Sequence, residues 1–430
     1  MDLTKARWGP EHPDTLRRMN ELGGALDRAG KHDQAVSLLE KTLESQTAKL
    51  GPEHPDTRST AARLGGACLG AKKYDLALPL LQKAFQELKT RNGPNAFSTL
   101  RMMHSLAMAT EFAASGTLER AMPLYEEALE RMKATGHEDT PVALTGLAGV
   151  YLDAGELDRA EALLREGLTL SSDSQRCPLG LARVLLDKAR NGTNDPAIAR
   201  ARLAEGEQLV RDTLAKARIR YANDPVTLER CLNDAAEAYY RGGNYAAAEP
   251  LLRKSMQSER ARLDAEHQNV SGAPASLARL LADWAWSERE TPSELRIPES
   301  KLPERAREAE RLLRECLGIL LRRTNAIPWQ VDDMKSRLGG ALVSVVVTDA
   351  ELDPAARQAK LAEAETLLLE GNQRLQESQA AWHIAKRDAL ERVVRLYEAA
   401  NKPDERAEWQ QTLEGFSKRM APSALVTRSE

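Results

Sequence analysis

The chain has 430 residues, of which 61 are basic and 64 are acidic, so its formal net charge is −3. This balance gives no overall positive field for nucleic acid or an anionic membrane, and 4% aromatic residues leave few rings for stacking bases. We therefore expect no nucleic acid and no membrane as partner. The charged content of 29%, rich in Glu and Arg beside Ala and Leu, is typical of helical proteins.

Cysteine usage and hydropathy indicate a cytoplasmic protein. The four cysteines, Cys68, Cys177, Cys231 and Cys316, lie far apart and form no C-x-x-C pair. Isolated cysteines of this kind are typical of small apolar helix residues in a reducing compartment. No segment reaches the ~18 apolar residues of a membrane span, and the N-terminus has no apolar run of a signal peptide.

A repeated heptapeptide is the most informative feature of the sequence. GPEHPDT occurs at 9–15 and again at 51–57, which is 42 residues later. Eroded copies begin at Gly93 and near Gly136. A fixed period indicates an array of similar units, each packed on its neighbours, and not one core around an active site. The question of function therefore becomes which surface binds a partner.

Each unit has the pattern of an antiparallel helix pair. In the first unit, two helical faces flank a break at Gly30. The first face is Leu16, Met19, Leu22, Gly23 and Leu26, and the second is Ala35, Val36, Leu39, Thr42 and Leu43. Asp14 and Thr15 are candidate caps of the first helix, after the extended entry that Pro13 imposes. A small residue such as Gly23 is expected where two helices approach closely.

The same pattern predicts an all-α fold of about nine antiparallel helix pairs in a single array over 1–430. The expected repeats are approximately 14–50, 56–92, 98–135, 140–171, 177–220, 225–265, 273–323, 330–378 and 381–418. Loop insertions are expected at 187–203, 286–305 and 348–359, and a flexible tail at 419–430. The middle insertion combines three prolines with charged residues, so we expect it to be a mobile loop.

The repeated helix-pair motifs resemble tetratricopeptide repeats (TPR). A 42-residue unit with H-P-D punctuation looks like the repeats of kinesin light chains, and is most similar to the arrays that follow the kinase domain in planctomycete-type bacterial serine/threonine kinases. The phrases that carry the likeness include YDLALPLLQKA at 74–84, AEPLLRKS at 248–255 and LERVVRLYEAANKPDERAEW at 390–409. The resemblance implies a right-handed superhelix, an α-solenoid, that binds a protein or peptide on its concave face.

Two functional readings follow from this resemblance. The first is a non-catalytic interaction scaffold in bacterial signalling. The alternative is the regulatory or substrate-docking region of a serine/threonine kinase whose catalytic domain is absent from this chain. Residues 2–8 align with 44–50, the tail of a second helix, so we expect a chain cut or decayed from something longer. A stand-alone scaffold gene is the competing account.

The sequence carries no signature of catalysis. It contains no Gly-rich nucleotide loop, no H-E-x-x-H, no G-x-S-x-G and no kinase motif set, so we expect no enzyme, no cofactor and no metal. The H-P-D tripeptides at 12–14 and 54–56 match that of J-domain co-chaperones, but recurrence at 42 residues favours a joint between repeats. We expect the proline to fix the bend, the aspartate to cap the next helix and the histidine to pack or hydrogen-bond locally.

The candidate binding residues lie on first helices, which line the concave face in this architecture. In kinesin light chains that stripe carries asparagines that hold a peptide backbone, and here Ala62, Thr145 and Ser336 break the ladder. Three arginines each precede an asparagine or histidine by three residues, which puts each pair on one helical face. The pairs are Arg17 with Asn20, Arg101 with His104, and Arg230 with Asn233.

An arginine offers a planar fork for carboxylates, and an asparagine offers a donor and an acceptor for a peptide bond. We hypothesise that these pairs line the groove and favour an acidic or C-terminal peptide segment. The alternative is that the arginines are solvated or pair with a neighbouring repeat. The oligomeric state stays open.

Overall fold

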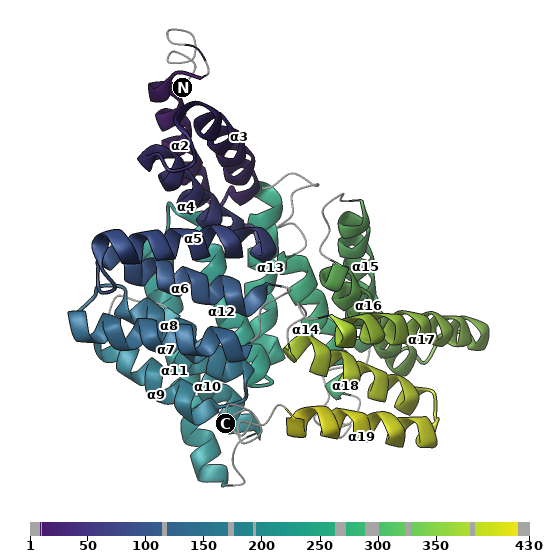
Figure 1. The fold of residues 1–430 in the computed structure, drawn as a ribbon. Helices are drawn as coiled ribbons and strands as arrows, with labels where there is room; N and C mark the ends of the chain where they lie inside the picture. The colour runs from purple at the N-terminus through teal and green to yellow at the C-terminus, as the bar shows by residue number, and fades with distance from the viewer. Residues whose placement is uncertain are drawn as a thin grey trace. The chain divides into compact units, whose positions relative to one another are not determined.

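The computed structural model describes residues 9, 11–113, 118–170, 176–191, 195–262, 272–288, 301–322, 328–378 and 383–419. All regular structure over these residues is helical, in 18 helices without a strand (Figure 1). The helices are α2 (Pro13–Arg28), α3 (His32–Leu50), α4 (Pro55–Gly70), α5 (Tyr74–Asn92), α6 (Phe97–Phe112), α7 (Leu118–Thr135), α8 (Thr140–Asp153), α9 (Leu157–Leu170), α10 (Arg176–Asn191), α11 (Pro196–Arg220), α12 (Pro225–Arg241), α13 (Tyr245–Arg262), α14 (Gly272–Glu288), α15 (Lys301–Leu321), α16 (Pro328–Thr348), α17 (Pro354–Glu377), α18 (His383–Ala399) and α19 (Pro403–Arg419).

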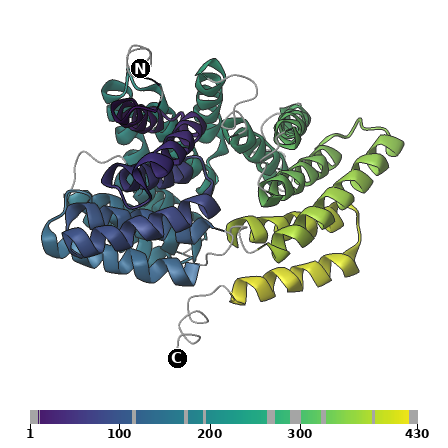
Figure 2. The same ribbon diagram turned by 45° about the horizontal axis from the view of Figure 1, so that its top comes forward.

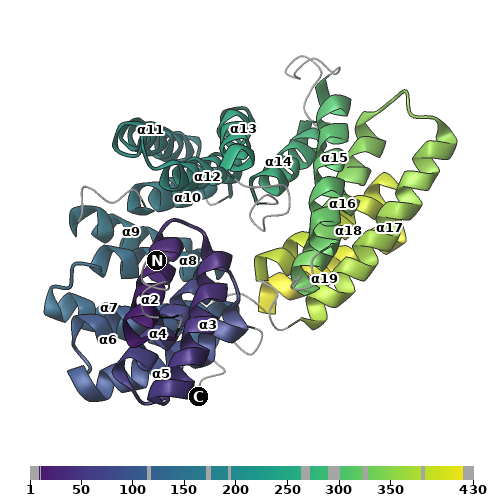
Figure 3. The ribbon, with the colours of Figure 1, turned by 90° about the horizontal axis from the view of Figure 1, so that it is seen from above.

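The described residues confirm the all-α class, and their 18 helices agree with the expected number of about nine pairs. Successive helices pack together in pairs such as α2–α3, α12–α13 and α18–α19. The chain divides into two compact units, 1–150 (unit 1) and 151–430 (unit 2). Within each unit, the first helix of a pair contacts the first helix of the next, as α2 does α4 and α14 does α16. Figures 2 and 3 show this side-by-side succession for α16 to α19 in unit 2. One continuous array over 1–430 stays a prediction.

Two of the expected loop insertions are mostly helix, which corrects the sequence prediction. Within 187–203, α10 continues to Asn191 and α11 begins at Pro196. Within 348–359, α16 ends at Thr348 and α17 begins at Pro354. Both later helices start with an aspartate whose carboxylate accepts backbone N–H bonds, followed by proline, which is a strong helix start. The extra residues therefore lengthen α11 and α17 to 25 and 24 residues.

The third expected insertion, 286–305, is helical at both edges, since α14 ends at Glu288 and α15 begins at Lys301. Residues 289–300 between them lie outside the described part of the chain, as do residues 420–430 of the expected tail. Among the described helices, none is long and apolar enough to span a membrane.

The histidine, and not the aspartate, caps the helix at each H-P-D joint. Nδ1 of His12 accepts a hydrogen bond from the backbone N–H of Asp14 at 3.3 Å, and His54 does the same with Asp56 at 3.2 Å. Proline takes the first helical position, so the preceding histidine becomes the N-cap and its ring reaches the next free N–H. Gly51 precedes this cap with φ 84° and ψ 161°, a conformation that essentially only glycine adopts.

The cap predicts a specific mutational contrast. His54→Ala is expected to lower the free energy of unfolding by about 1 kcal/mol, because a helix N–H loses its acceptor. His54→Asn is expected to retain most of the stability, since its amide oxygen accepts the same bond. Urea denaturation followed by circular dichroism measures both. Equal losses in the two variants would show that the ring stabilises the joint by packing alone.

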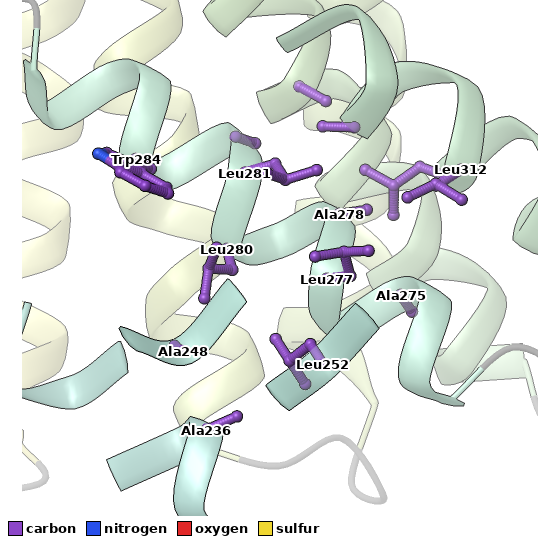
Figure 4. Packing of buried hydrophobic residues seen from close by; sticks show 14 of the residues in the cluster. Ala236, Ala248, Leu252, Ala275, Leu277, Ala278, Leu280, Leu281, Trp284 and Leu312 are labelled. Atoms are coloured by element: carbon purple, nitrogen blue, oxygen red, sulfur yellow. The ribbon is translucent and has the colours of Figure 1, made fainter. Parts of the chain in front are cut away.

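Glycines of first helices make room for leucines of second helices. A Cβ on Gly23 would lie 2.6 Å from Cγ of Leu39, and one on Gly339 would lie 2.6 Å from Cγ of Leu368. The small residue that the sequence places in the middle of the first helix therefore receives a side chain of its partner helix. Alanine and leucine dominate the interior of unit 2 in the same way, as in the cluster that joins α14 to α15 (Figure 4).

The phrase A-E-x-L-L-R links successive second helices in unit 2. Arg253 of α13 bonds Glu249 in its own helix and both carboxylate oxygens of Glu308 in α15, at 2.8 and 2.7 Å. The same double contact joins Arg165 to Glu161 and Glu205, and Arg314 to Glu310 and Glu363. This motif therefore stabilises the packing of successive second helices, because its arginines form ion pairs within the protein.

Candidate functional site

A groove of about 700 Å³ in unit 1 is the strongest candidate site, and its volume lies in the range of ligand pockets. Helices α2, α4, α5 and α6 supply its walls. Its charged lining residues, which define the arginine groove, are Arg28, Arg58, Arg63, Arg91, Arg101, Asp27 and Glu87. Five arginines thus face two carboxylates, although the whole chain has a slight excess of acid.

Both carboxylates of the arginine groove already have partners. Oδ1 of Asp27 lies 2.8 Å from Nδ1 of His32. Glu87 lies 3.6 Å from Nε of Arg58 and 3.9 Å from Nζ of Lys83. Neither carboxylate forms an ion pair with Arg28, Arg63 or Arg101.

Arg28, Arg63 and Arg101 form no ion pair with any residue that the structure describes, and all three are exposed. Arg101 lies over the ring of Phe97, with 5.9 Å from Cζ to the ring centroid. Exposed arginines are often solvated, but three unpaired ones in a single groove leave a local positive charge that can attract an anion. The site can therefore bind an anionic ligand by charge-assisted hydrogen bonds.

A second cavity, of about 540 Å³ in unit 2, is also rich in arginine but is neutralised from within. Arg395 of α18 donates to Asp283 of α14, and the hydroxyl of Tyr240 donates to the same carboxylate at 2.6 Å. Nε of Arg241 donates to Glu237 at 2.8 Å. Burial raises the pKa of Asp283, but the Arg395 guanidinium, the Tyr240 hydroxyl and Arg392 together outweigh it and hold that pKa below its usual value.

Two further arginines of this cavity lie on α18, and a third lies beside a ring. Arg387 lies 3.3 Å from Asp388, and Arg392 donates to the hydroxyl of Ser336 at 3.1 Å. Arg190 lies over the ring of Tyr245. Carboxylates of the chain form ion pairs with most arginines of the unit 2 cavity. This cavity is therefore a stabilising network between helices, in contrast to the arginine groove.

Of the six residues predicted from the sequence, the structure places only Arg101 in the arginine groove. Arg17 lies 3.7 Å from Asp14 and 3.5 Å from Asp56 of the next repeat, as the alternative reading expected. Asn20 is buried in α2. His104 is also buried, edge-on to Tyr125 and so close to α8 that a Cβ on Gly146 would lie 2.6 Å from its ring.

Arg230 and Asn233 belong to α12 of unit 2, where Arg230 is exposed and Asn233 lines a cavity of only about 30 Å³. The structure therefore does not bring the six residues together. In both pairs of unit 1 the arginine is exposed, whereas Asn20 or His104, three residues later, is buried. Contact of any of the six with a partner stays a prediction.

Sequence reasoning missed Arg28 and Arg63. They occupy different positions of the repeat, because 42 residues after Arg28 stands Gly70 and 42 residues before Arg63 stands Glu21. A search for a recurring pattern cannot detect such residues.

Among the described residues, no group of three or more His, Cys, Asp or Glu side chains is placed to hold a metal ion. The four cysteines are buried, and burial raises the pKa of the Cys68 thiol to about 11. These thiols are therefore packing residues, as their sequence context indicated.

The helix pairs define an α-solenoid, and comparison with family models identifies its repeats. Three models described as tetratricopeptide repeat match residues 17–89, 112–177 and 229–269. The chain therefore contains tetratricopeptide repeats over these residues. No curated protein matches the sequence closely enough to count as a relative.

Several solved structures are similar in fold. A Rap protein complexed with competence and sporulation factor is 12% identical, covers 95% of this chain and 99% of its own, and has a TM-score of 0.50. Kinesin light chain TPR-like repeats of Podosopora anserina are 22% identical over 50% of this chain and 98% of theirs, with a TM-score of 0.37. A human IFIT1 dimer with PPP-AAAA is 14% identical over 94% and 97%, with a TM-score of 0.39. At such identities the likeness shows the fold alone.

Proposed function

We propose that the chain is a non-catalytic interaction module that binds an acidic segment of a partner protein in the arginine groove. The observation that supports this proposal is the gathering of Arg28, Arg63 and Arg101, without ion pairs among the described residues, around carboxylates that are already paired. A guanidinium binds a carboxylate through two parallel hydrogen bonds, so three such groups favour a segment with several acidic side chains.

The apolar part of the lining favours a peptide over a nucleic acid. Leu88, Phe97 and Met102 lie among the arginines, and Phe97 is 44% exposed. Apolar side chains between charged ones match an acidic peptide that also carries apolar residues. A single-stranded nucleic acid would need several aromatic rings for successive bases, and Phe97 is the one aromatic residue of this lining.

The cellular role of this module is inferred from its sequence motifs alone. Their likeness to kinase-attached arrays favours a role in bacterial signalling, inside the cell. The second candidate is that the chain serves as the docking region of a serine/threonine kinase. In both settings the arginine groove would hold the partner segment.

Charge reversal in the groove tests the proposal. A decapeptide that alternates glutamate with leucine or serine is the probe, and its affinity for the full-length chain is measured by fluorescence anisotropy. Arg63→Glu with Arg101→Glu is expected to weaken binding about tenfold or more, because each lost charge-assisted contact contributes about 1.5–3 kcal/mol. The control is Arg200→Glu with Arg218→Glu, which changes the net charge equally at two exposed arginines of α11.

Equal affinity of the groove variant and the control would overturn the proposal. A single-stranded oligonucleotide of the same charge is measured in parallel. If it binds more tightly than the peptide and depends on the same arginines, the groove belongs to a nucleic acid instead.

A further inference from the structure

Two guanidinium groups of the arginine groove lie side by side above Gly24. Nη1 of Arg28 lies 3.7 Å from the point that a Cβ on residue 24 would occupy, and Nη1 of Arg63 lies closer still to that point. Arg28 belongs to α2 and Arg63 to α4, so two successive repeats each contribute one cation. Two guanidinium groups that lie this close to one point repel each other unless an anion lies between them.

The described part of the chain supplies no such anion. Asp27, the carboxylate of the groove on the same helix, is engaged by His32, and Glu87 is engaged by Arg58 and Lys83. Neither Arg28 nor Arg63 forms an ion pair with a described residue. The pair is therefore a concentrated positive charge of +2 that stands open to the groove.

The two guanidiniums occupy the space beside Gly24. Its neighbour Gly23 receives Leu39, but the side chains within 4 Å of a Cβ on residue 24 are the guanidiniums of Arg63 and Arg28. Gly24 lies inside α2, where glycine costs about 1 kcal/mol relative to alanine. Glycine at position 24 therefore leaves the space in which the Arg63 guanidinium lies, and an alanine methyl group would displace it.

We propose that Arg28 and Arg63 clasp the phosphate monoester of a phosphorylated side chain in the partner segment. This inference rests on the proposed function and specifies its ligand. A carboxylate carries one negative charge and is satisfied by one guanidinium, whereas a phosphate monoester carries about −1.5 to −2 at neutral pH and offers three acceptor oxygens. Charge and acceptor number of the phosphate both match two guanidiniums from two helices.

The experiment compares three twelve-residue acidic peptides that differ at one central position, which is phosphoserine, glutamate or serine. Affinities for the full-length chain are measured by isothermal titration calorimetry. We expect the wild type to bind the phosphoserine peptide about tenfold more tightly than the glutamate peptide, the gain expected of one further charge-assisted contact. Arg28→Gln and Arg63→Gln are expected to abolish this preference, whereas Arg18→Gln, on the same helix but paired with Glu21, is expected to keep it.

Gly24→Ala separates binding from folding. Its Cβ would displace the Arg63 guanidinium, while the helix gains the higher propensity of alanine, so the preference is expected to fall without loss of stability. Gly149→Ala in α8 is the control, because a Cβ there meets nothing within 4 Å and the residue does not line the groove, so it is expected to keep the preference. Retention of the phosphoserine preference in folded Gly24→Ala and in Arg63→Gln would overturn the clasp.

The outcomes distinguish the two proposals. Equal affinity of the wild type for the phosphoserine and glutamate peptides would overturn the clasp and leave the proposed function in place. Failure of all three peptides to bind would overturn the proposed function itself. Inorganic phosphate is added as competitor, and if it binds as tightly as the phosphoserine peptide, the site takes a free anion and the peptide ligand is wrong.

Discussion

Asp283→Asn is expected to lower the free energy of unfolding of unit 2 by about 3–5 kcal/mol at pH 7, the cost of breaking a buried ion pair. Asp283 accepts from Arg395 and from Tyr240, and its side chain is only 17% exposed. The substitution leaves the Arg395 guanidinium without its anion deep in the unit 2 cavity. Chemical denaturation of the full-length chain, followed by tryptophan fluorescence, measures the loss.

The same carboxylate predicts how stability depends on pH. Its pKa is lower in the folded state than in the unfolded chain, so the unfolded chain binds the proton more readily. The stabilisation is fully present above the unfolded pKa of about 3.9 and is lost as pH falls through the folded pKa. In Asp283→Asn this acid-dependent component is expected to be absent.

The control for this prediction removes both partners. Asp283→Asn with Arg395→Gln is expected to be less destabilised than Asp283→Asn alone, because no uncompensated charge remains. If the two losses simply add, Asp283 and Arg395 are not energetically coupled and the network does not stabilise unit 2.

Adjacent glycines of α4 give the second large contrast. Gly65→Ala is expected to lower the free energy of unfolding of unit 1 by about 1–3 kcal/mol, since its Cβ would lie 2.9 Å from Cδ2 of Leu81, which is buried. Gly66→Ala is expected to raise it by about 1 kcal/mol, because the helix gains propensity and its Cβ meets nothing within 4 Å. Thermal and urea denaturation of the two variants compare neighbouring positions of one helix.

A stabilising Gly65→Ala would contradict this account of the packing. It would mean that Leu81 moves aside at little cost and that the glycine of each first helix is not required by its leucine. In that case the spacing between the two helices of a pair would depend on the alanines and leucines around this glycine.

The helix pairs were predictable because their determinants recur. Gly9, Gly51 and Gly93 have positive φ and lie 42 residues apart, and the Gly23–Leu39 contact recurs 42 residues later as Gly65–Leu81. The insertions were misjudged for a local reason. Insertions between helices are predicted at 187–203 and 348–359, whereas in each range an aspartate followed by a proline starts a long helix, at Pro196 and at Pro354.

The candidate site was less predictable, because it depends on which charges find partners. The sequence marks Arg17 and Arg101 as equivalents, yet Arg17 reaches Asp56 of the next repeat and Arg101 has no carboxylate within reach among the described residues. Likewise, the histidine rather than the aspartate caps each joint, since only the geometry after proline decides which side chain meets the free N–H. Pairing across repeats is a property of the folded array.

The central claim, that the arginine groove binds an acidic segment, is tested most directly by labelling arginines with a dicarbonyl reagent and mapping the products by mass spectrometry. We expect the glutamate decapeptide to protect Arg28, Arg63 and Arg101 from modification, while Arg200 and Arg218 react as before. Unchanged labelling of the three groove arginines at a saturating peptide concentration, or protection confined to unit 2, would contradict it.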